Sequence, residues 1–532
     1  MEFKTVFGPG TGGPSDYYRI PSMITTKNGV VVACADARFF TGADNPNRID
    51  KVVRRSMDSG ETWEDYQTVV EEYGEEKNLS SAAIDPILTY SSDTGRIFMH
   101  YCHTPAGVGI LNCNSCIGED AEGNRIISRG FRKYILKDGA LYTKSGKKTV
   151  YAVSEDGKVT DGKTDFGSIY TGGKFKEAHT STLMMCYSDD DGLTWSKPVS
   201  LNSQIKKKYM SFIGPGPGCG IVIKHGKYSG RIIVPIYYGV RKFPLGLSCC
   251  VIYSDDNGET WSMGETPNNT RKIHGIKANH HFIIEQNMLT ESQVIEQEDG
   301  TLKYFMRNHD PKRCVAVAYS KNGGESWENF THDENLPQPI CQSSVIKIEN
   351  AEKPYVVFLN AADKKARQCG TVRLSEDDGE TFPYSRVLKE DSFVYSSMTQ
   401  LPDGNIGVLF EPDLECQNIC SSFYRSGAVG HIFKNCNEEL FYQLMNLNFP
   451  APETVLKLTY TDGLYYMLAV LKDFLLDEEH TQDWISEILT YFNKKYDTYK
   501  CHYTDVIGDS ENEKSVAFKL YPIIKDWLKL RN

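Results

Sequence analysis

An arginine stands in the apolar run Tyr17-Tyr-Arg19-Ile-Pro21, with Met23 and Ile24 close behind it. A guanidinium that points inward from such a segment needs an anionic partner, because an unpaired buried charge is costly. A structural carboxylate could fill that role, and so could an anionic ligand. Arginine suits a carboxylate ligand because its planar fork stays charged and donates two parallel hydrogen bonds.

Several other residues could do chemistry, but their spacing supports no site. Cys102-His103 and Cys113-Asn-Ser-Cys116 could supply zinc ligands, yet a second Cys-x-x-Cys is missing. Gly214-Pro-Gly-Pro-Gly218 precedes no Gly-Lys-Ser/Thr, so it predicts a loop and not a phosphate cradle. His280-His281 and Cys416-x3-Cys420 have no recognisable companions. We therefore predict no metal site from these residues, although a structural calcium ion stays open because its ligands need no visible motif.

One motif repeats along the chain and indicates the scaffold that must position any site. Its full form is Ser-x-Asp-x-Gly-x-Thr-Trp, and two degraded copies replace the Asp and Thr or the Trp. The copies begin at Ser56, Ser188, Ser254, Ser320 and Ser375. The second, third and fourth are spaced evenly, and the first interval leaves room for a repeat without the motif.

We call this motif the box, and its residues predict a turn between two strands. The Asp can accept backbone N–H bonds, the Gly permits a positive φ, and the aromatic residue can be buried against the strands that follow. Runs rich in β-formers precede the boxes, as in Cys249–Tyr253 and Val315–Tyr319. Strand-turn-strand units at this period predict an all-β propeller. We do not expect the boxes to act in catalysis, because their polar side chains hydrogen-bond to their own backbone.

The composition limits the class of protein. The 532 residues are 40% hydrophobic and 24% charged, which is typical of a globular chain. The net charge of −11 gives no basic footprint for nucleic acid. The longest apolar run, residues 464–471, is far shorter than the roughly 20 residues that span a bilayer, so we expect no transmembrane segment. The 15 scattered cysteines show no disulfide rhythm, and we read most as reduced or buried thiols.

Two stretches depart from the repeat and divide the chain. Residues 105–178 are rich in Gly, Lys and Asp and predict a small β-rich insertion. From about Glu438 the apolar residues recur at helical spacing, which predicts a C-terminal α-helical appendage. The expected organisation is propeller in residues 1–104 and 179–436, an insertion in 105–178, and helices of unknown role in 437–532.

Arg-Ile-Pro near the N-terminus followed by several boxes resembles the sialidase (neuraminidase) family, and in particular its bacterial exo-α-sialidase type. The resemblance covers roughly residues 3–436. It implies a six-bladed β-propeller that cleaves terminal sialic acid. It also implies that an arginine triad, Arg19, Arg307 and Arg367, binds the carboxylate of the substrate. Arg373 lies six residues beyond Arg367, but it reads as part of the strand that enters the fifth box.

The resemblance further implies a catalytic set. Tyr395 matches the nucleophile and Glu291 its partner base, an arrangement that suits a substrate whose anomeric carbon already bears a carboxylate. A neutral phenol avoids the repulsion that an Asp or Glu nucleophile would meet. Asp44, in a Gly-containing loop, matches the general acid, which would need a raised pKa to work at neutral pH.

Supporting residues follow from the same resemblance. Glu411, flanked by apolar residues, matches the carboxylate that orients Arg19. Arg38 and Asp85 match substrate contacts near the 4-hydroxyl and the N-acetyl group. Asp85 could equally cap a turn before Pro86.

The resulting hypothesis is a retaining exo-α-sialidase that acts through a covalent sialyl-tyrosine on sialylated glycoproteins, glycolipids or oligosaccharides, with no cofactor required. A trans-sialidase on the same fold, inter- or intramolecular, is the main alternative. A non-catalytic sialoglycan-binding propeller is the second, and it would predict decay of the catalytic set. Localisation stays open between two alternatives. The resemblance implies a secreted or cell-surface protein, whereas no apolar leader is visible at the N-terminus, which leaves a cytoplasmic location as the alternative. Linkage preference and oligomeric state are not readable from the sequence.

Overall fold

The computed structural model describes residues 3–240, 246–280, 283–413 and 419–423. Their regular secondary structure is almost entirely β-strand, which confirms the all-β prediction. The chain divides into two units, Met1–Met445 and Asn446–Asn532. The predicted C-terminal helices lie outside the described residues. Within the described residues, no helix is long and apolar enough to cross a membrane.

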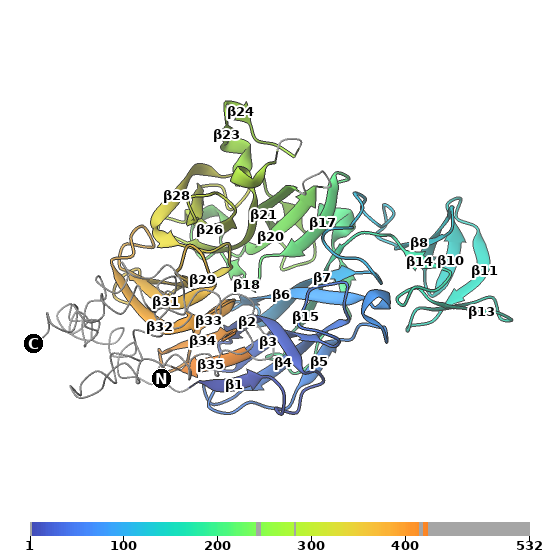
Figure 1. The fold of residues 1–532 in the computed structure, drawn as a ribbon, viewed down its shortest axis with the longest axis horizontal. Helices are drawn as coiled ribbons and strands as arrows, with labels where there is room; N and C mark the ends of the chain where they lie inside the picture. The colour runs from blue at the N-terminus through green and yellow to red at the C-terminus, as the bar shows by residue number, and fades with distance from the viewer. Residues whose placement is uncertain (1–2, 241–245, 281–282, 414–418, 424–532) are drawn as a thin grey trace, which may run out of the picture. The chain divides into compact units, whose positions relative to one another are not determined.

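Four-stranded antiparallel arrangements recur along the first unit (Figure 1). The first contains β2 (Tyr17–Thr25), β3 (Val31–Arg38), β4 (Ile49–Ser56) and β5 (Gln67–Val70). A parallel bridge from β4 joins it to β6 (Ala82–Ser91), β7 (Arg96–Thr104), β15 (Thr182–Ser188) and β16 (Val199–Ser200). The third contains β17 (Met210–Pro215), β20 (Ile232–Val240), β21 (Gly246–Ser254) and β22 (Ser262–Met263), with β19 (Ile221–Val222) beside β20.

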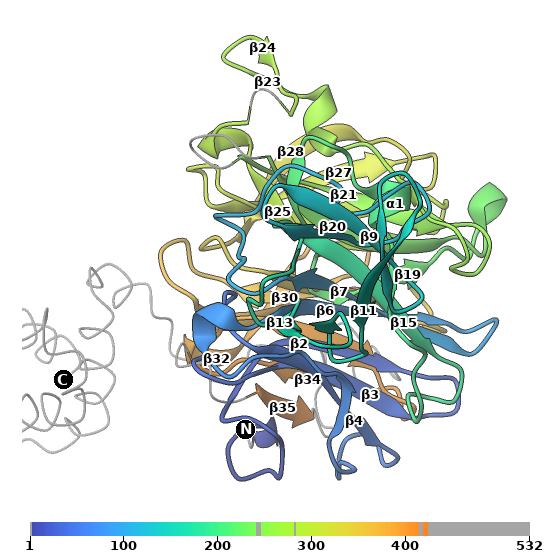
Figure 2. The same cartoon turned by 90° about the vertical axis from the view of Figure 1, so that its right-hand side faces the viewer.

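Two further sheets follow the same plan, and a last one closes the series. They are β25 (Leu289–Glu296), β26 (Leu302–Asn308), β27 (Cys314–Ser320) and β28 (Glu328–Pro337), then β29 (Ser343–Lys347), β30 (Val356–Ala361), β31 (Gln368–Ser375) and β32 (Tyr384–Ser392). The last combines β33 (Ser396–Gln400), β34 (Ile406–Phe410) and β35 (Ile419–Phe423) with β1 (Lys4–Phe7). The N-terminal strands and the orange β34 and β35 therefore lie side by side (Figures 1 and 2).

The core lies within and between these sheets. The inner strands are buried on both faces: all nine residues of β20 (IIVPIYYGV) and all eight of β25 (LTESQVIE) are buried. Short elements complete the described chain: α1 (Asn202–Ile205), the hairpin of β23 (Lys272–Ile273) and β24 (Ile276–Lys277), and 3-10 turns at Lys77–Leu79, Gly226–Tyr228, Pro267–Thr270 and Glu285–Asn287.

Each box forms the turn between the third and fourth strands of a sheet, as its residues predict. In the first, Asp58 accepts the backbone N–H of Thr62 at 2.8 Å and its hydroxyl at 2.5 Å, and the second, third and fifth boxes repeat the arrangement. In the fourth, Asn322 accepts the backbone N–H of Ser326 at 3.0 Å and donates to its hydroxyl at 2.9 Å. The box glycines have φ near +80°, and those of the second to fifth boxes pack against the preceding sheet. A Cβ at Gly258 would lie 2.4 Å from the Phe98 ring, so this turn serves as an inter-sheet contact as well as a hairpin.

The aromatic residue of the third box is buried differently from the prediction. Trp261 packs edge-on against His100 and Phe98 of β7, at ring-centroid distances of 4.8 and 6.3 Å. Its partners therefore belong to the preceding sheet and not to the strands that follow it. In the fourth box, Trp327 instead stacks on Tyr304 of its own sheet at 4.5 Å.

The predicted loop at Gly214–Gly218 is wrong, because most of it is strand. Residues Met210–Pro215 form β17, and Gly218–Cys219 form β18, which contacts β2, β6, β29 and β33 (Figure 1). Ser22 and Gln342 donate to the carbonyls of Gly218 and Pro217 at 2.6 and 3.0 Å. A Cβ at residue 216 would lie 2.9 Å from backbone atoms of β25, so the glycines permit this close central passage.

Residues Ile126–Glu177 form a sheet of their own, in the order β13-β12-β11-β10-β9-β8-β14. The strands are β8 (Ile126–Arg129), β9 (Arg132–Lys137), β10 (Ala140–Thr143), β11 (Lys148–Val153), β12 (Lys158–Thr160), β13 (Asp165–Ser168) and β14 (Lys176–Glu177). The sheet has a separate aromatic core that includes Tyr134, Phe166 and Phe175. We call residues 126–177 the inserted sheet.

Candidate active site

Tyr395, Glu291 and Arg307 form a buried hydrogen-bonded group. Tyr395 lies just before β33, and the other two come from β25 and β26 of a different sheet. The Tyr395 hydroxyl donates to Oε1 of Glu291. Arg307 donates through Nη1 to Oε2 of Glu291 and, at 2.7 Å, to the Tyr395 oxygen. The phenol is therefore held between a proton acceptor and a fixed positive charge.

Burial raises the pKa of the Tyr395 phenol well above its ordinary value. The charges of Arg307 and Arg367 oppose this shift, and the Glu291 carboxylate adds to it. The phenol is therefore neutral at physiological pH. It can become a nucleophile only if its proton moves to a neighbouring base as a bond forms, and the Glu291 carboxylate is in place to accept it.

Three guanidinium groups converge on Tyr395. The Cζ atoms of Arg19 and Arg367 lie 5.2 and 5.6 Å from the centre of its ring, and Arg307 contacts its hydroxyl. Arg19 comes from β2, and Arg367 lies immediately before β31. Arg373, the alternative to Arg367, is part of β31 and donates to the side chain of Asn360 at 3.1 Å. The three arginines that the resemblance implies thus lie around one point.

Glu411 holds Arg19 in place. It follows β34, its side chain is only 1% exposed, and it accepts from Nε and Nη2 of Arg19, each at 3.2 Å. The same carboxylate accepts the backbone N–H of Ile20 at 2.7 Å. Ile20 has a φ of +60°, a left-handed value that is rare for a β-branched residue, at the irregularity between Arg19 and Ser22 in the β2–β3 register. This local distortion turns the chain so that backbone and side chain meet one carboxylate.

Asp44 lies at the open side of the arginine cluster. Its side chain is 64% exposed, and Oδ1 lies 2.7 Å from Nη1 of Arg38 and 3.6 Å from Nη1 of Arg19. Desolvation pushes the pKa of this carboxyl upward, but the charges of Arg38 and Arg19 outweigh it and hold the pKa below its ordinary value. The expectation of a raised pKa is therefore wrong here, because two guanidiniums face this carboxylate.

Arg38 is fully buried beside a second carboxylate. Its Nη2 donates to Asp36 at 2.9 Å, and Nζ of Lys51 donates to the same carboxylate. Asp36 and Arg38 are two residues apart on β3 and thus share one face of the strand. That period-2 spacing is the signal that could have identified Asp36, which the sequence analysis missed.

Asp85 lies within β6 and is not a turn cap. It has a φ of +61° at the irregularity between Ile84 and Ile87, and it accepts the Tyr237 hydroxyl at 3.0 Å. Burial, reinforced by the nearby carboxylates of Asp36, Asp44 and Glu291, raises the pKa of Asp85 to about 8. Tyr237 was also missed, because nothing in the sequence distinguishes it from the other tyrosines of the chain.

The candidate zinc ligands do not assemble. His103 lies between two carboxylates, with Nδ1 2.8 Å from Glu72 and Nε2 3.1 Å from Glu177. Cys102 and Cys113 are buried in an apolar cluster. In the part of the chain that the structure describes, no three His, Cys, Asp or Glu side chains gather as metal ligands.

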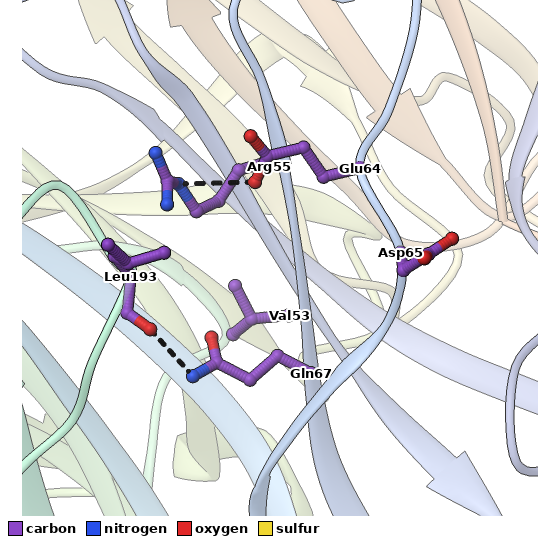
Figure 3. A pocket seen from close by; sticks show the side chains of 6 residues that line it. All are labelled: Val53, Arg55, Glu64, Asp65, Gln67 and Leu193. Atoms are coloured by element: carbon purple, nitrogen blue, oxygen red, sulfur yellow. Dashed lines mark hydrogen bonds and ion pairs between the residues drawn. The ribbon is translucent and has the colours of Figure 1, made fainter.

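A surface hollow of about 310 Å³ lies elsewhere, where the second box meets β4 and the segment before β5 (Figure 3). Gln67 donates to the backbone oxygen of Leu193 at 2.9 Å, and Arg55 pairs with Glu64 at 3.7 Å. None of the candidate catalytic residues lines it. We interpret this hollow as the seam between two sheets.

Comparison with known proteins agrees with this geometry. Residues 168–408 match the family described as a BNR repeat-like domain. The chain is 26% identical over 475 residues to an anhydrosialidase of Macrobdella decora, covering 77% of this chain and 59% of that protein. It is 28% identical over 410 residues to a sialidase of Micromonospora viridifaciens, covering 74% of this chain and 50% of that protein.

A solved structure shares the fold. The intramolecular trans-sialidase from Ruminococcus gnavus, in complex with oseltamivir carboxylate, superposes with a TM-score of 0.66 at 24% identity, covering 80% of this chain and 98% of that one. The chain spans only about half to three fifths of the length of the two curated relatives. The chain is thus similar to sialidases over about three quarters of its length, and it shares the fold of the trans-sialidase structure.

Proposed function

We propose that this protein is an exo-α-sialidase, a glycoside hydrolase that releases terminal sialic acid from glycoproteins, glycolipids or oligosaccharides. One observation carries the proposal: the Tyr395 hydroxyl donates to Glu291 while three arginines surround the same phenol. A carboxylate clamp beside a phenol–carboxylate couple suits a sugar whose anomeric carbon bears a carboxylate. A non-catalytic binding propeller would have no need for that couple.

The scaffold of the proposal is a six-bladed propeller over residues 1–104 and 179–436. Its support is that the first strands of successive sheets contact one another in series, from β2 through β6, β17, β25 and β29 to β33, with β20 linking β17 to β25. The contact of β33 with β2 closes the series. Residues 105–178 then form an insertion after the second strand of the second blade. Residues 437–532 remain a region of unknown role.

Arg19, Arg307 and Arg367 would bind the carboxylate of sialic acid, with Glu411 fixing Arg19. Each guanidinium can donate two parallel hydrogen bonds to a carboxylate. Together the three can hold an anionic substrate although the protein has a net charge of −11. Arg38 and Asp85 would contact the sugar near its 4-hydroxyl and N-acetyl group. Asp85, neutral over much of the physiological pH range, would be able to donate as well as accept.

The proposed reaction proceeds with retention. Asp44 protonates the departing glycosidic oxygen while the Tyr395 oxygen attacks the anomeric carbon and its proton passes to Glu291. The glycosidic bond breaks and a sialyl-tyrosine forms. In the second step Asp44 takes a proton from water, the water oxygen attacks the anomeric carbon, and the phenolate regains its proton from Glu291. No cofactor takes part, and a structural calcium ion is not required.

The substrate itself would adjust Asp44 for this role. A carboxylate bound to Arg19 competes with Asp44 for that positive charge, and it also adds a negative charge nearby. Both effects favour the protonated form of Asp44. We therefore expect Asp44 to be ionised in the free enzyme and to hold a proton that it can donate only in the complex.

Intramolecular trans-sialidation is the second candidate, favoured by the anhydrosialidase of Macrobdella decora and the Ruminococcus gnavus trans-sialidase among the relatives. In that reaction a hydroxyl of the bound sugar's own glycerol arm replaces water in the second step. Both candidates share the residues described above. Mass analysis of the product separates them, because the internal ether is lighter than free sialic acid by one water.

The decisive experiment is the release of 4-methylumbelliferone from its α-sialoside. We expect Tyr395→Phe to lower kcat/KM by at least a thousandfold, and Asp44→Ala by less, since this leaving group needs little protonation. Tyr319→Phe is the matched control, because the Tyr319 hydroxyl also donates to a carboxylate, Glu380 at 3.0 Å, outside the site. If Tyr395→Phe and Asp44→Ala both turned over the sialoside as fast as the wild type, the assignment would be refuted. A first product with inverted configuration in a time-resolved NMR spectrum would refute it as well.

A further inference from the structure

The inserted sheet carries a charge opposite to that of the rest of the chain. Residues 126–177 contain eleven Lys and Arg and six Asp and Glu, a net charge of +5. The remaining 48 basic and 64 acidic residues give the rest of the chain a net charge of −16. A basic surface on an acidic protein attracts anions locally within about a Debye length, ~8–10 Å at physiological salt.

Many of these charges lie on one face of the sheet. Residues paired directly across two antiparallel strands share a face, with Cβ atoms ~5 Å apart. One row across the sheet is Lys176, Ser128 and Lys133, from β14, β8 and β9. A second row ends at Lys148, which lies opposite Tyr142 on β10. The same strand alternation puts Lys137 on this face, since it lies two and four positions from Ile135 and Lys133 on β9.

We call this surface the lysine face, and its four cations are available to a ligand. They are Lys133, Lys137, Lys148 and Lys176, all exposed. None of the four has an ion-pair partner within 4 Å among the described residues. Where the sheet does pair its lysines, as in Lys158 with Asp165 at 3.0 Å, the pair lies at the far edge on β12 and β13.

Apolar groups lie between these lysines. Ile135 and Tyr142 are half-buried and directly opposite one another, and Val150 on β11 is 73% exposed. The opposite side of the sheet is fully engaged in its own aromatic core, where Arg129 stacks on Phe166 and Phe175 at 4.8 and 5.2 Å. The lysine face thus combines separated positive charges with a tyrosine that presents an apolar ring and a polar tip.

We propose that the lysine face is a second binding surface, which holds a carboxylated glycan chain while the active site cleaves its ends. This inference rests on the proposed sialidase function. An extended sialoglycan carries repeated carboxylates separated by sugar rings, which matches spaced lysines around Ile135, Tyr142 and Val150. The rest of the protein, with its net charge of −16, would repel such a polyanion. A polyanion would therefore bind most favourably at the local basic surface.

The test measures binding separately from catalysis. In the full-length Tyr395→Phe background, we compare binding to an immobilised, heavily sialylated mucin with and without Lys133→Glu and Lys148→Glu. We expect the double charge reversal to weaken binding at least tenfold and to flatten its dependence on salt. Lys27→Glu with Lys227→Glu is the matched control, because both lysines are exposed and lie outside the inserted sheet. It should bind like the parent.

Two further readouts keep the proposal open to refutation. In the active enzyme the charge reversals should leave kcat/KM for 4-methylumbelliferyl sialoside within twofold, and should raise KM for the mucin at least fivefold. Binding that is equal for desialylated mucin, or stronger for RNA, would overturn the proposal, as would an unchanged KM for mucin. If the wild-type enzyme failed to turn over the small sialoside while mucin binding still depended on Lys133 and Lys148, the proposed function would fail and the binding surface would stand.

Discussion

Glu411→Gln tests whether one buried carboxylate organises the site. Glu411 accepts four hydrogen bonds, two from Arg19 and one each from the backbone N–H groups of Ile20 and Tyr395. The amide keeps one acceptor oxygen but turns an NH₂ group toward donors, so about two of the four bonds are lost. At ~1.5–3 kcal/mol for a hydrogen bond to a charged group, the free energy of unfolding should fall by about 3–5 kcal/mol, as for other broken buried ion pairs.

The neighbouring Asp44 moderates that loss. It lies 3.6 Å from Arg19 on the exposed side and can partly compensate the abandoned guanidinium, so we expect a value near the lower limit, about 3 kcal/mol. The Arg19 guanidinium would then shift toward Asp44 and away from its position for binding the substrate. We therefore expect kcat/KM to fall about a hundredfold, as is usual when a binding group is displaced. Urea unfolding and sialoside turnover measure the two effects on the same preparation.

Glu349→Gln is the matched control for this experiment. Its carboxylate pairs with Lys224, and both side chains are about half exposed. An exposed pair contributes ~0–1 kcal/mol, so this variant should lose little stability and no activity. If Glu411→Gln lost less than about 1 kcal/mol and kept its kcat/KM, the view of Glu411 as the organiser of Arg19 would be wrong.

Three other predictions follow from contacts outside this pair. Burial lowers the pKa of His103, but the charges of two carboxylates outweigh it and raise this pKa to about 9. Burial raises the pKa of Glu177, but the charges of Arg125 and His103 outweigh it and lower this pKa to about 2. The stability that His103 contributes should be complete below its ordinary pKa of ~6.5 and should be lost as the pH rises through 9. The stability that Glu177 contributes should be complete above its ordinary pKa of ~4.5 and should be lost as the pH falls through 2. Urea unfolding against pH should show both slopes, and His103→Gln should remove the alkaline one. Gly258→Ala should cost about 2–3 kcal/mol, because the new Cβ would lie 2.4 Å from an aromatic ring, whereas Gly162→Ala, with a similar φ but open space around it, should cost about 1 kcal/mol. Finally, a sialic acid analogue should take up protons on binding at pH 5, visible by calorimetry in buffers of different ionisation enthalpy, and Asp44→Asn should abolish that uptake.

Local features of the fold could be predicted from the sequence because their causes are local. Each box carries its own turn geometry, with an Asp, or an Asn in the fourth, that accepts bonds from residues within four positions and a glycine at positive φ. The strands around Cys249–Tyr253 and Val315–Tyr319 follow from runs of β-formers and lie within β21 and β27. The β-structure of the inserted sheet could also be predicted, because its alternating residues lie within a short span of sequence. None of these features depends on a distant part of the chain.

The assembly of the candidate active site could not be predicted from local sequence patterns, because its residues come from different sheets. The sequence named Arg19, Arg307, Arg367 and Tyr395 only through a resemblance, and no periodicity relates their positions. Arg19 reaches Tyr395 because β2 of the first sheet contacts β33 of the last.

Two further features were decided only by the fold. The partner of Asp85 is Tyr237, supplied by β20 of another sheet. The direction of the Asp44 pKa reversed the expectation, because electrostatic shifts depend on distances in space, here to Arg38 and Arg19. Sequence patterns report what a residue does to its own neighbours along the chain, whereas charge, burial and reactivity are set by neighbours that only the folded protein provides.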